Sequence, residues 1–443
     1  MSIYRVSTAN SYDGTINRIN QRTAELVATQ EKLAAGKRVL KASDDPVAAT
    51  LAERESNRLM RTEADLRALE RSRSGLIQAE STIGQMGEVL ARFKELLVQA
   101  GNPTLSASDR QSIAQEMRGL REQLLNLANT QDTEGNALLG GLGVTNVLGK
   151  PFADVYGANT GVVFQAVSGQ AAATETALPN RVDGSFALMR VPTGDGYFEV
   201  EQVSGNVLVT GIAIRDMDAL MATGFYADPP ANVDFSVQVN WDGTQATLDV
   251  FRSDTAQPIQ SVPLGPASPG QTLNLRQALG AASIAVSDDT ASPPIDYGFD
   301  IELDGSVTFP AAVTSDPIAR FDLKPSQTGD LFATLQRAID ALEADGNSTQ
   351  LTQELGRVHQ EMQAGLDRLL LVRGRLGELL RRADSIESQL QDRSVASQKE
   401  LSNLTDLDLV KGISDFQTQQ LGLQVALQSY AQVQRLTLFQ YIA

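Results

Sequence analysis

The sequence predicts a multi-domain α plus β protein, in which terminal coiled-coil helices and an α-helical bundle carry an inserted β-rich domain. Fourteen of the 16 prolines lie between Pro151 and Pro325, as do 15 of the 23 aromatic residues and the only tryptophan. The flanking segments are rich in Leu, Ala, Gln, Glu and Arg. Because proline is poorly tolerated inside helices and aromatic residues favour strands, the expected order is helix, β-rich insert, helix.

These composition changes predict three domains, since 443 residues exceed the usual size of a single core. Residues 1–40 and 405–443 are expected to form a terminal coiled-coil, inner domain. Residues 41–145 and 326–404 are expected to form a helical, rod-like domain. Residues 146–325 are expected to form an inserted β-rich outer domain, which carries most of the negative charge of the chain.

Local signals place the first two helices. The first is expected from about Asn10 to Ala35, where Gly36 provides a natural C-terminal cap. Asp45 suits the N-cap of the next helix and Pro46 its first position. This second helix is expected to continue to the break at 101–103.

The remaining helices are also marked by capping residues. Ser106, with Asp109 three residues later, resembles a capping pair that opens a third helix ending near Asn129. After the β-rich insert, helix is expected from about Asp330, with an interruption at 345–347 and then through much of the remaining chain.

Two Asp-Gly pairs predict hairpins in the β-rich insert. Apolar residues alternate from Phe235 to Trp241, Asp242-Gly243 follows, and the alternation resumes at Leu248 and Val250. The same pattern runs from Tyr297 to Leu303, then Asp304-Gly305, then Val307 and Phe309. Asp-Gly supplies the positive φ angles of a tight turn. Asp300, Glu302 and Asp304 faintly resemble a calcium loop without its distal Glu, so a turn is the preferred interpretation.

Apolar residues at both ends of the chain alternate at spacings of three and four, which is typical of a coiled-coil seam. The residues predicted to form the assembly interface on these seams are Ile16, Ile19, Leu26, Leu33, Ile413, Phe416, Leu423, Leu427 and Tyr430. The carboxyl-terminal helix carries further apolar residues off its seam, including Leu421 and Val425. A helix that is apolar nearly all round must be buried on several sides, so we expect other copies of the protein to cover it.

Composition argues against catalysis and several kinds of partner. The formal net charge of -17 opposes binding to nucleic acid, and no run is apolar enough for membrane insertion. The absence of cysteine excludes disulfides and thiolate chemistry, and the single histidine, His359, is expected on a helix surface. The sequence therefore predicts a non-enzyme with no cofactor and no metal.

Several motifs resemble the bacterial flagellin superfamily. They are Arg5-Val6-Ser7-Thr8, Leu33-Ala34-Ala35-Gly36-Lys37-Arg38-Val39, Ser43-Asp44-Asp45-Pro46-Val47-Ala48-Ala49, Leu120 to Asn129, and Leu421 to Tyr430. The Ser-Asp-Asp-Pro segment is more narrowly similar to the hook–filament junction proteins of that superfamily. The resemblance covers about residues 1–145 and 326–443, and the central region assigns nothing.

The resemblance implies a structural subunit of the flagellum that joins hook to filament as a ring homo-oligomer of this chain. It implies contacts with a neighbouring hook-associated protein and with flagellin, and an export chaperone that binds the C-terminal region. The implied location is extracellular, on the flagellum, after export without a cleavable signal peptide. Ser43, Asp44, Asp45 and Pro46 are then expected to shape the corner between the inner and middle layers.

Two alternatives remain open on the sequence alone. Filament flagellin shares the same terminal motifs. A surface adhesin would instead place its function in the β-rich binding domain.

Overall fold

The computed structural model describes residues 8–144, 150–154, 162–227, 233–281, 283–344 and 348–442. The chain divides into two compact units. The first unit comprises Met1–Glu70, Glu175–Ala177 and Asp384–Ala443, and the second comprises Arg71–Thr174 and Leu178–Ala383. Both units contain long helices and the second also contains the sheets, so the predicted α plus β class is confirmed.

The first unit is helical. It contains α1 (Thr8–Ala35), α9 (Leu409–Ile442), the start of α2 (Pro46–Ala100) and the end of α8 (Ser348–Thr405). Helix α1 ends where predicted, because Gly36 adopts the left-handed conformation with φ of 65° and its N–H donates to the Leu33 carbonyl at 3.3 Å. Helix α2 begins at Pro46 and ends at Ala100, as predicted.

The helical part of the second unit is built from the rest of α2 and α8 together with α3 (Ala107–Ala128) and α7 (Leu331–Glu343). Ser106 and Asp109 form the predicted capping box at the start of α3. Asp330 caps α7 by accepting the Phe332 N–H. The predicted interruption at 345–347 lies outside the described residues. Large apolar side chains from all four helices are fully buried, among them Leu76, Phe93, Met117, Leu335 and Met362.

Two antiparallel sheets enclose the core of the β-rich region, called the β domain from here on. The five-stranded sheet has the order β10-β9-β8-β14-β6, and in the second sheet β13 pairs with β7, β11 and β12. The strands are β6 (Phe198–Ser204), β7 (Val207–Ile214), β8 (Phe235–Trp241), β9 (Gln245–Arg252), β10 (Gln260–Pro266), β11 (Thr272–Asn274), β12 (Ser283–Asp288), β13 (Ile295–Thr308) and β14 (Ala319–Pro325). Short helices α5 (Met217–Ala222) and α6 (Leu275–Leu279) pack against β13.

Short elements connect the β domain to the helices. They are β1 (Gly143–Val144), β2 (Phe152–Asp154), β3 (Val162–Phe164), β4 (Ala166–Val167), α4 (Gly184–Leu188), β5 (Val191–Pro192) and β15 (Thr328–Gly329). Strand β5 pairs with β15, so the chain enters and leaves the β domain side by side.

The first predicted hairpin is confirmed. Strands β8 and β9 pair antiparallel around Asp242-Gly243, and Gly243 has a φ of 101°. The Asp242 carboxylate accepts the Thr244 and Gln245 N–H groups, both at 2.8 Å, which closes the turn. These bonds also hold the pKa of Asp242 below its ordinary value.

The second predicted hairpin is wrong. Strand β13 runs without a turn through Asp304-Gly305, because this long strand changes partners there. It pairs with β7 up to Gly305 and with β11 from Ser306. Gly305 has a φ of 111°, and a Cβ added to it would lie 2.6 Å from the Asn206 carbonyl oxygen. The glycine therefore bends a continuous strand beside a close neighbour.

The other sequence features have plain structural roles. Asp300, in the segment that faintly resembled a calcium loop, accepts a hydrogen bond from Arg215 at 2.6 Å. Across the described parts of the chain, His, Cys, Asp and Glu side chains form no group able to hold a metal ion. His359 lies on helix α8 but is half-buried, and burial together with Lys94 lowers its pKa. None of the helices within the described ranges is long and apolar enough to cross a membrane.

Candidate assembly site

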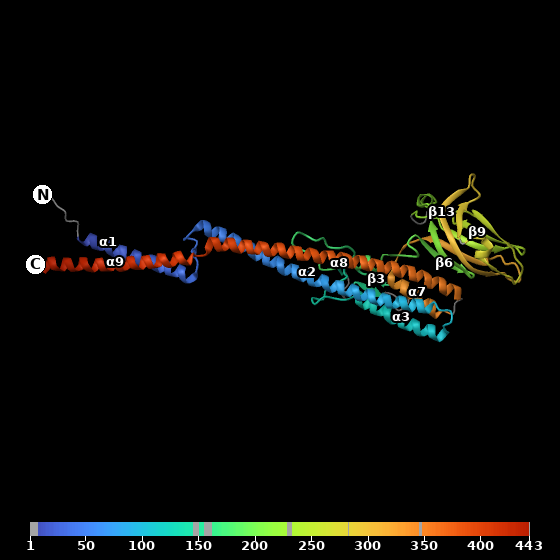
Figure 1. The fold of residues 1–443 in the computed structure, drawn as a ribbon, viewed down its shortest axis with the longest axis horizontal. Coiled ribbons are helices and arrows are strands. Elements are labelled where there is room, and N and C mark those ends of the chain that lie inside the picture. Colours follow the sequence, from blue (N-terminus) through green and yellow to red (C-terminus); the bar gives the residue numbers. More distant parts are fainter. Residues whose placement is uncertain are drawn as a thin grey trace. The chain divides into compact units, whose positions relative to one another are not determined.

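Helices α1 and α9 pack against each other in opposite directions (Figure 1). The end of α1 meets the start of α9, where a Cβ on Gly412 would lie 3.6 Å from a Leu33 methyl group. Further along the pair, the Thr29 hydroxyl donates to the Gln419 side-chain oxygen at 2.8 Å. The pairing joins the two ends of the chain within the first unit.

Seven of the nine predicted seam residues lie partly covered in the first unit. On α1 they are Ile16, Ile19, Leu26 and Leu33, and on α9 they are Phe416, Leu423 and Tyr430. The other covered positions of α9 are Gly412, Gln419, Gly422 and Ala426. The covered face of α9 therefore alternates at three and four residues, as a coiled-coil partner requires.

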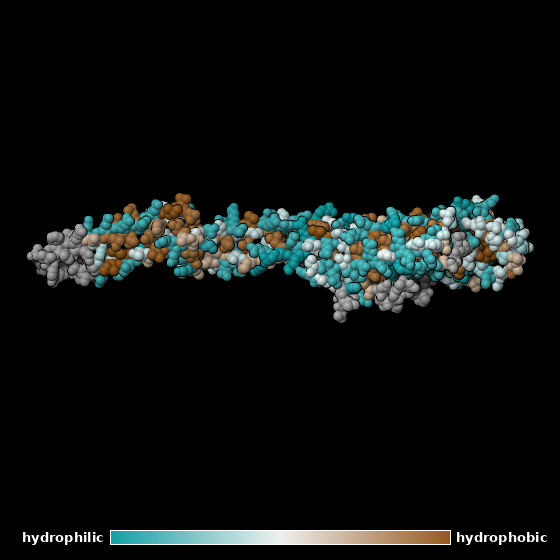
Figure 2. All heavy atoms as spheres, turned by 90° about the horizontal axis from the view of Figure 1, so that it is seen from below, coloured by the Kyte–Doolittle hydropathy of each residue, from teal (hydrophilic) through white to brown (hydrophobic). Residues whose placement is uncertain are grey.

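Ile413 and Leu427, the two remaining seam residues, lie outside that covered face with exposures of 46% and 47%. Val410, Leu421 and Val425 are also exposed, at 82%, 62% and 53%. We call these five residues the open face of α9. Figure 2 shows apolar residues gathered on the surface over the paired terminal helices. Because α1 covers only one side of α9, the isolated chain leaves this apolar area in water.

Two hydrogen bonds across the pair were missed by the sequence analysis. The Arg22 guanidinium donates to the Gly422 carbonyl oxygen at 2.7 Å, in addition to the bond from Thr29 to Gln419. A Cβ on Gly422 would lie 3.0 Å from the Arg22 guanidinium nitrogen, so a side chain at this position would crowd the bond. The only available signal was a glycine inside a strongly helical pattern, which often marks close approach of another chain segment.

Backbone hydrogen bonds hold the corner after α1 against the end of α8. The Arg38 N–H donates to the Thr405 carbonyl at 2.7 Å, and the Leu407 N–H donates to the Gly36 carbonyl at 2.9 Å. The Arg38 guanidinium also donates to the Leu404 carbonyl at 2.8 Å. The two bonds from Arg38 satisfy carbonyl groups that the end of α8 would otherwise leave without partners, and the bond from Leu407 does the same for the carbonyl of Gly36 after α1.

The aspartates of the predicted corner shape the turn into α2. Asp44 accepts the Lys41 and Leu40 N–H groups, both at 3.1 Å, and these bonds lower its pKa. Asp45 accepts the Ala48 N–H at 3.0 Å and a bond from Arg38, and these bonds lower its pKa too. Both carboxylates are thus favoured in the charged form.

The other two corner residues contribute differently. Pro46 occupies the first position of α2, where its fixed φ suits a helix and its missing N–H is harmless. Ser43 is exposed in the turn that precedes it. The interlayer role of the four residues stays a prediction. A second break, at 406–408, separates α8 from α9, and Asp408 caps α9 by accepting the Val410 N–H at 3.0 Å.

Comparison with known proteins shows similarity to flagellar proteins. Residues 6–143 match the bacterial flagellin N-terminal helical region. Flagellar hook-associated protein 3 of Escherichia coli is 23% identical over 98% of this chain and 99% of its own length. Flagellin A of Vibrio anguillarum is 32% identical, but over only 28% of this chain and 32% of its own.

The fold is similar to that of a solved hook-associated protein. The crystal structure of flagellar hook-associated protein 3 from Legionella pneumophila aligns with a TM-score of 0.62 at 21% identity. The alignment covers 80% of this chain and 98% of the other. At this identity the likeness shows a shared fold.

Proposed function

We propose that this chain, which is similar over nearly its full length to flagellar hook-associated protein 3 and matches the flagellin N-terminal helical region over residues 6–143, is a structural subunit joining the flagellar hook to the filament. Copies of the chain form a ring and contact a neighbouring hook-associated protein on one side and flagellin on the other. The protein acts on the outside of the cell, as part of the flagellum. An export chaperone holds the C-terminal region before assembly.

The open face of α9 is the observation that carries this proposal. Burying a Val, Leu or Ile side chain contributes about 1.5–3 kcal/mol. Because the five residues of the open face are between 46% and 82% exposed, the area they leave in water equals that of about three whole side chains. Burying it represents about 4–9 kcal/mol that α1 leaves unused. Packing α9 against α9 and α1 of neighbouring copies recovers it, so the driving force for assembly is stored in the subunit.

The extent of the similarity supports a junction protein over the alternatives. The match to hook-associated protein 3 runs through the terminal helices and the β domain, whereas the match to Flagellin A stops at about a quarter of the chain. Filament flagellin and a surface adhesin are therefore not favoured. The mechanism is geometric, since force passes through packed helices.

Replacing both Ile413 and Leu427 with Ala tests this proposal. The variant should remain a folded monomer with unchanged helix content, because both residues are already exposed, but it should no longer assemble. The measurement is filament formation and swimming in a strain that lacks the gene. Met221→Ala, which truncates a 55% exposed side chain in the β domain, is the matched control and should assemble normally.

Immunogold labelling then separates the alternatives. Label confined to the tip of the hook is expected for the junction protein. Label along the whole filament would mean flagellin. Normal assembly of the Ile413→Ala, Leu427→Ala variant would remove the open face from the mechanism.

A further inference from the structure

The β domain is joined to the helices through a narrow neck. Strands β5 and β15 pair over only two residues each, at Val191–Pro192 and Thr328–Gly329. Next to them, Thr193 donates its N–H to the Gln327 carbonyl at 2.8 Å and accepts the Gln327 N–H on its hydroxyl at 2.9 Å. So short a ladder can tie two segments together, but by itself it leaves a domain free to turn.

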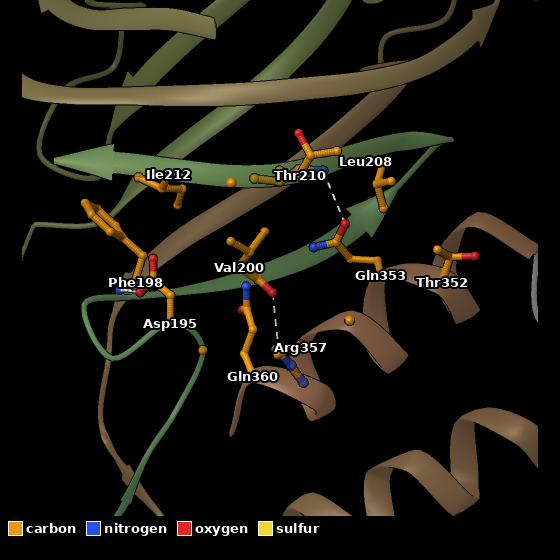
Figure 3. A pocket seen from close by; sticks show the side chains of 14 residues that line it. Asp195, Phe198, Val200, Leu208, Thr210, Ile212, Thr352, Gln353, Arg357 and Gln360 are labelled. Atoms are coloured by element: carbon orange, nitrogen blue, oxygen red, sulfur yellow. Dashed lines mark hydrogen bonds between the residues drawn. The ribbon is translucent and has the colours of Figure 1, made fainter. Parts of the chain in front are cut away.

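Side chains of α8 reach from beside the neck to one strand of each sheet (Figure 3). The Gln353 side-chain oxygen accepts the Val209 N–H of β7 at 3.2 Å. The Arg357 guanidinium donates to the Val200 carbonyl of β6 at 3.4 Å. Among the described strands, β6 pairs only with β14 and β7 only with β13, so each has an edge without a strand partner. The helix thus supplies hydrogen bonds to both edges.

Glu361, one turn further along α8, is fully buried at the base of the neck. Its carboxylate accepts the Gly194 N–H at 3.2 Å and the Thr334 hydroxyl of α7 at 2.7 Å, and it pairs with Arg337. A buried carboxylate is tolerated only when such partners surround it. Of these partners, Gly194 belongs to the β-domain side of the neck.

Any other residue at position 194 would displace the hydrogen bond between the Gly194 N–H and the Glu361 carboxylate. Its φ is +62°, and an added Cβ would lie 1.9 Å from the Phe198 carbonyl oxygen. Arg357 extends the same network, because it pairs with Glu354 at 2.9 Å and with Glu199 of β6 at 3.4 Å. The charged side chains of α8 therefore contact the β domain at Gly194, Glu199 and Val200.

Cavities lie on both sides of Arg357. One, of 270 Å³, is lined by β6, β7 and α8, and Gln353 and Arg357 reach into it (Figure 3). The other, of 430 Å³, is lined by β6 and α8 together with the end of α7. Apolar packing therefore does not fill the junction, and the polar contacts carry its geometry.

We propose that Gln353, Arg357 and Glu361 form a latch that fixes the orientation of the β domain on the helical bundle. The β5–β15 ladder is the hinge about which the domain turns when the latch is broken. The two cavities provide the space into which it moves. The latch holds a single orientation, because the Val209 N–H, the Val200 carbonyl and the Gly194 N–H reach α8 together only in that pose. This inference concerns the second unit and does not depend on the proposed assembly role.

The test measures one distance across the junction in the full-length protein. The chain has no cysteine, so Ala91→Cys on α2 and Ala256→Cys in the β domain provide the only two thiols for spin labels. Both positions are exposed. With the latch intact, pulsed electron resonance should give one narrow distance distribution. Arg357→Ala and Gln353→Ala should each broaden it or add a second peak.

Hydrogen exchange provides a second readout. In Gln353→Ala, the Val209 amide should exchange about tenfold faster or more, since it loses its acceptor. Amides of the β8–β9 hairpin should be unchanged, which shows that the β domain is still folded. Arg373→Ala is the matched control, because it removes an arginine from the same helix and breaks a pair with Glu80 of α2 at 2.6 Å away from the neck.

The outcomes are distinct. Broadening in both latch variants, with a narrow distribution in Arg373→Ala, supports the latch. An unchanged narrow distribution in both latch variants overturns it, because the ladder alone would then fix the domain. Equal broadening in the control also overturns it, since the effect would not belong to these residues. Gln353→Ala keeps the experiment decisive should Arg357→Ala fail to fold, because it removes only one neutral hydrogen bond.

Discussion

The β domain and the paired terminal helices differ in how much of their apolar surface is buried within one chain. In the β domain, the inward residues of β13, including Phe299, Ile301 and Leu303, are all fully buried. In the terminal pair, α9 places Val410 and Leu421 on the surface at 82% and 62% exposure. The two regions have comparable apolar content, but only one of them covers it within a single chain.

The two regions obtain their stability from different contacts. A sheet sandwich buries both inner faces by folding on itself, and its aromatic rings contact one another, as Phe299 contacts Phe198 and Phe235 at centroid distances of 5.1 and 5.3 Å. Two helices can cover only one side of each other, and isolated helices gain little without packing. The β domain is therefore completed by folding, whereas the terminal pair is completed by assembly in the function that we propose.

The largest expected effect comes from a cavity in the β domain. Phe299→Ala should lower the free energy of unfolding of the β domain by about 3–5 kcal/mol, because it removes a fully buried ring and leaves a cavity. Trp241, the only tryptophan, lies in this domain and donates its ring N–H to the Ala267 carbonyl at 3.1 Å. Its fluorescence therefore reports unfolding of the β domain alone during titration with urea.

Leu421→Ala is the matched change in the terminal pair. Because Leu421 is 62% exposed, the free energy of unfolding of the isolated chain, measured by urea titration, should change by less than about 0.5 kcal/mol. A large loss from Leu421→Ala in the monomer would break the comparison, since it would mean that the chain already buries this residue.

A smaller effect concerns pH and the second unit. Asp330 accepts the Val162 and Phe332 N–H groups, both at 2.8 Å, but burial is the largest influence and raises its pKa, despite the nearby positive charge of Arg121. The folded state therefore binds the proton more tightly than the unfolded state, and this contribution to stability is lost as pH rises through the folded pKa.

Asp330→Asn should remove that dependence. Between the ordinary aspartate pKa of about 4 and neutral pH, the unfolding free energy of the variant should fall less steeply with rising pH, or rise more steeply, than that of the natural protein. Urea unfolding followed by helix circular dichroism at several pH values measures the slope. Parallel curves for the two proteins would contradict the assignment.

The sequence predicts the helices well because their signals are local. The Gly36 cap, the Asp45-Pro46 start and the Ser106–Asp109 capping box each depend on residues within one turn of the helix end. The β8–β9 hairpin was predictable for the same reason, since Asp242 closes the turn with bonds to its next few residues.

The wrong hairpin shows where local signals fail. Asp304-Gly305 has the composition of a turn, but the conformation of Gly305 is set by β7 and β11, which are distant in sequence. The Glu361 network escaped prediction similarly, because Gly194 and Glu361 are 167 residues apart. No spacing rule connects such partners before the topology is known.

The covered face of α9 was predicted in part. Heptad spacing located Phe416, Leu423 and Tyr430 on the covered face of α9, but hydrophobicity favoured Ile413 and Leu427 over the smaller Gly412 and Ala426. Close packing selects the small residue at position 412, because a Cβ there would lie 2.8 Å from the Leu407 side chain and 3.6 Å from that of Leu33. The larger residues are left outward, and their role in assembly stays a prediction.

The smallest expected effect concerns Asp44, at the corner of the first unit. The contribution of Asp44 to stability depends on pH with the opposite sign to that of Asp330. The N–H groups of Lys41 and Leu40 hold the pKa of Asp44 below its ordinary value, so its contribution to stability is present above the unfolded pKa and is lost as pH falls through the folded pKa.

At neutral pH, Asp44→Asn should speed amide exchange at Leu40 and Lys41 by a factor of about two to five, because bonds to a charged acceptor are stronger. Lowering the pH through the folded pKa of Asp44 should bring the protection of these amides in the natural protein to the level of the variant. Ser43→Ala, one residue away and exposed, should match the natural protein throughout. Equal exchange in the natural protein and Asp44→Asn at neutral pH would show that the charge of Asp44 does not hold the corner, and the contrast in acid response between the two regions would then be lost.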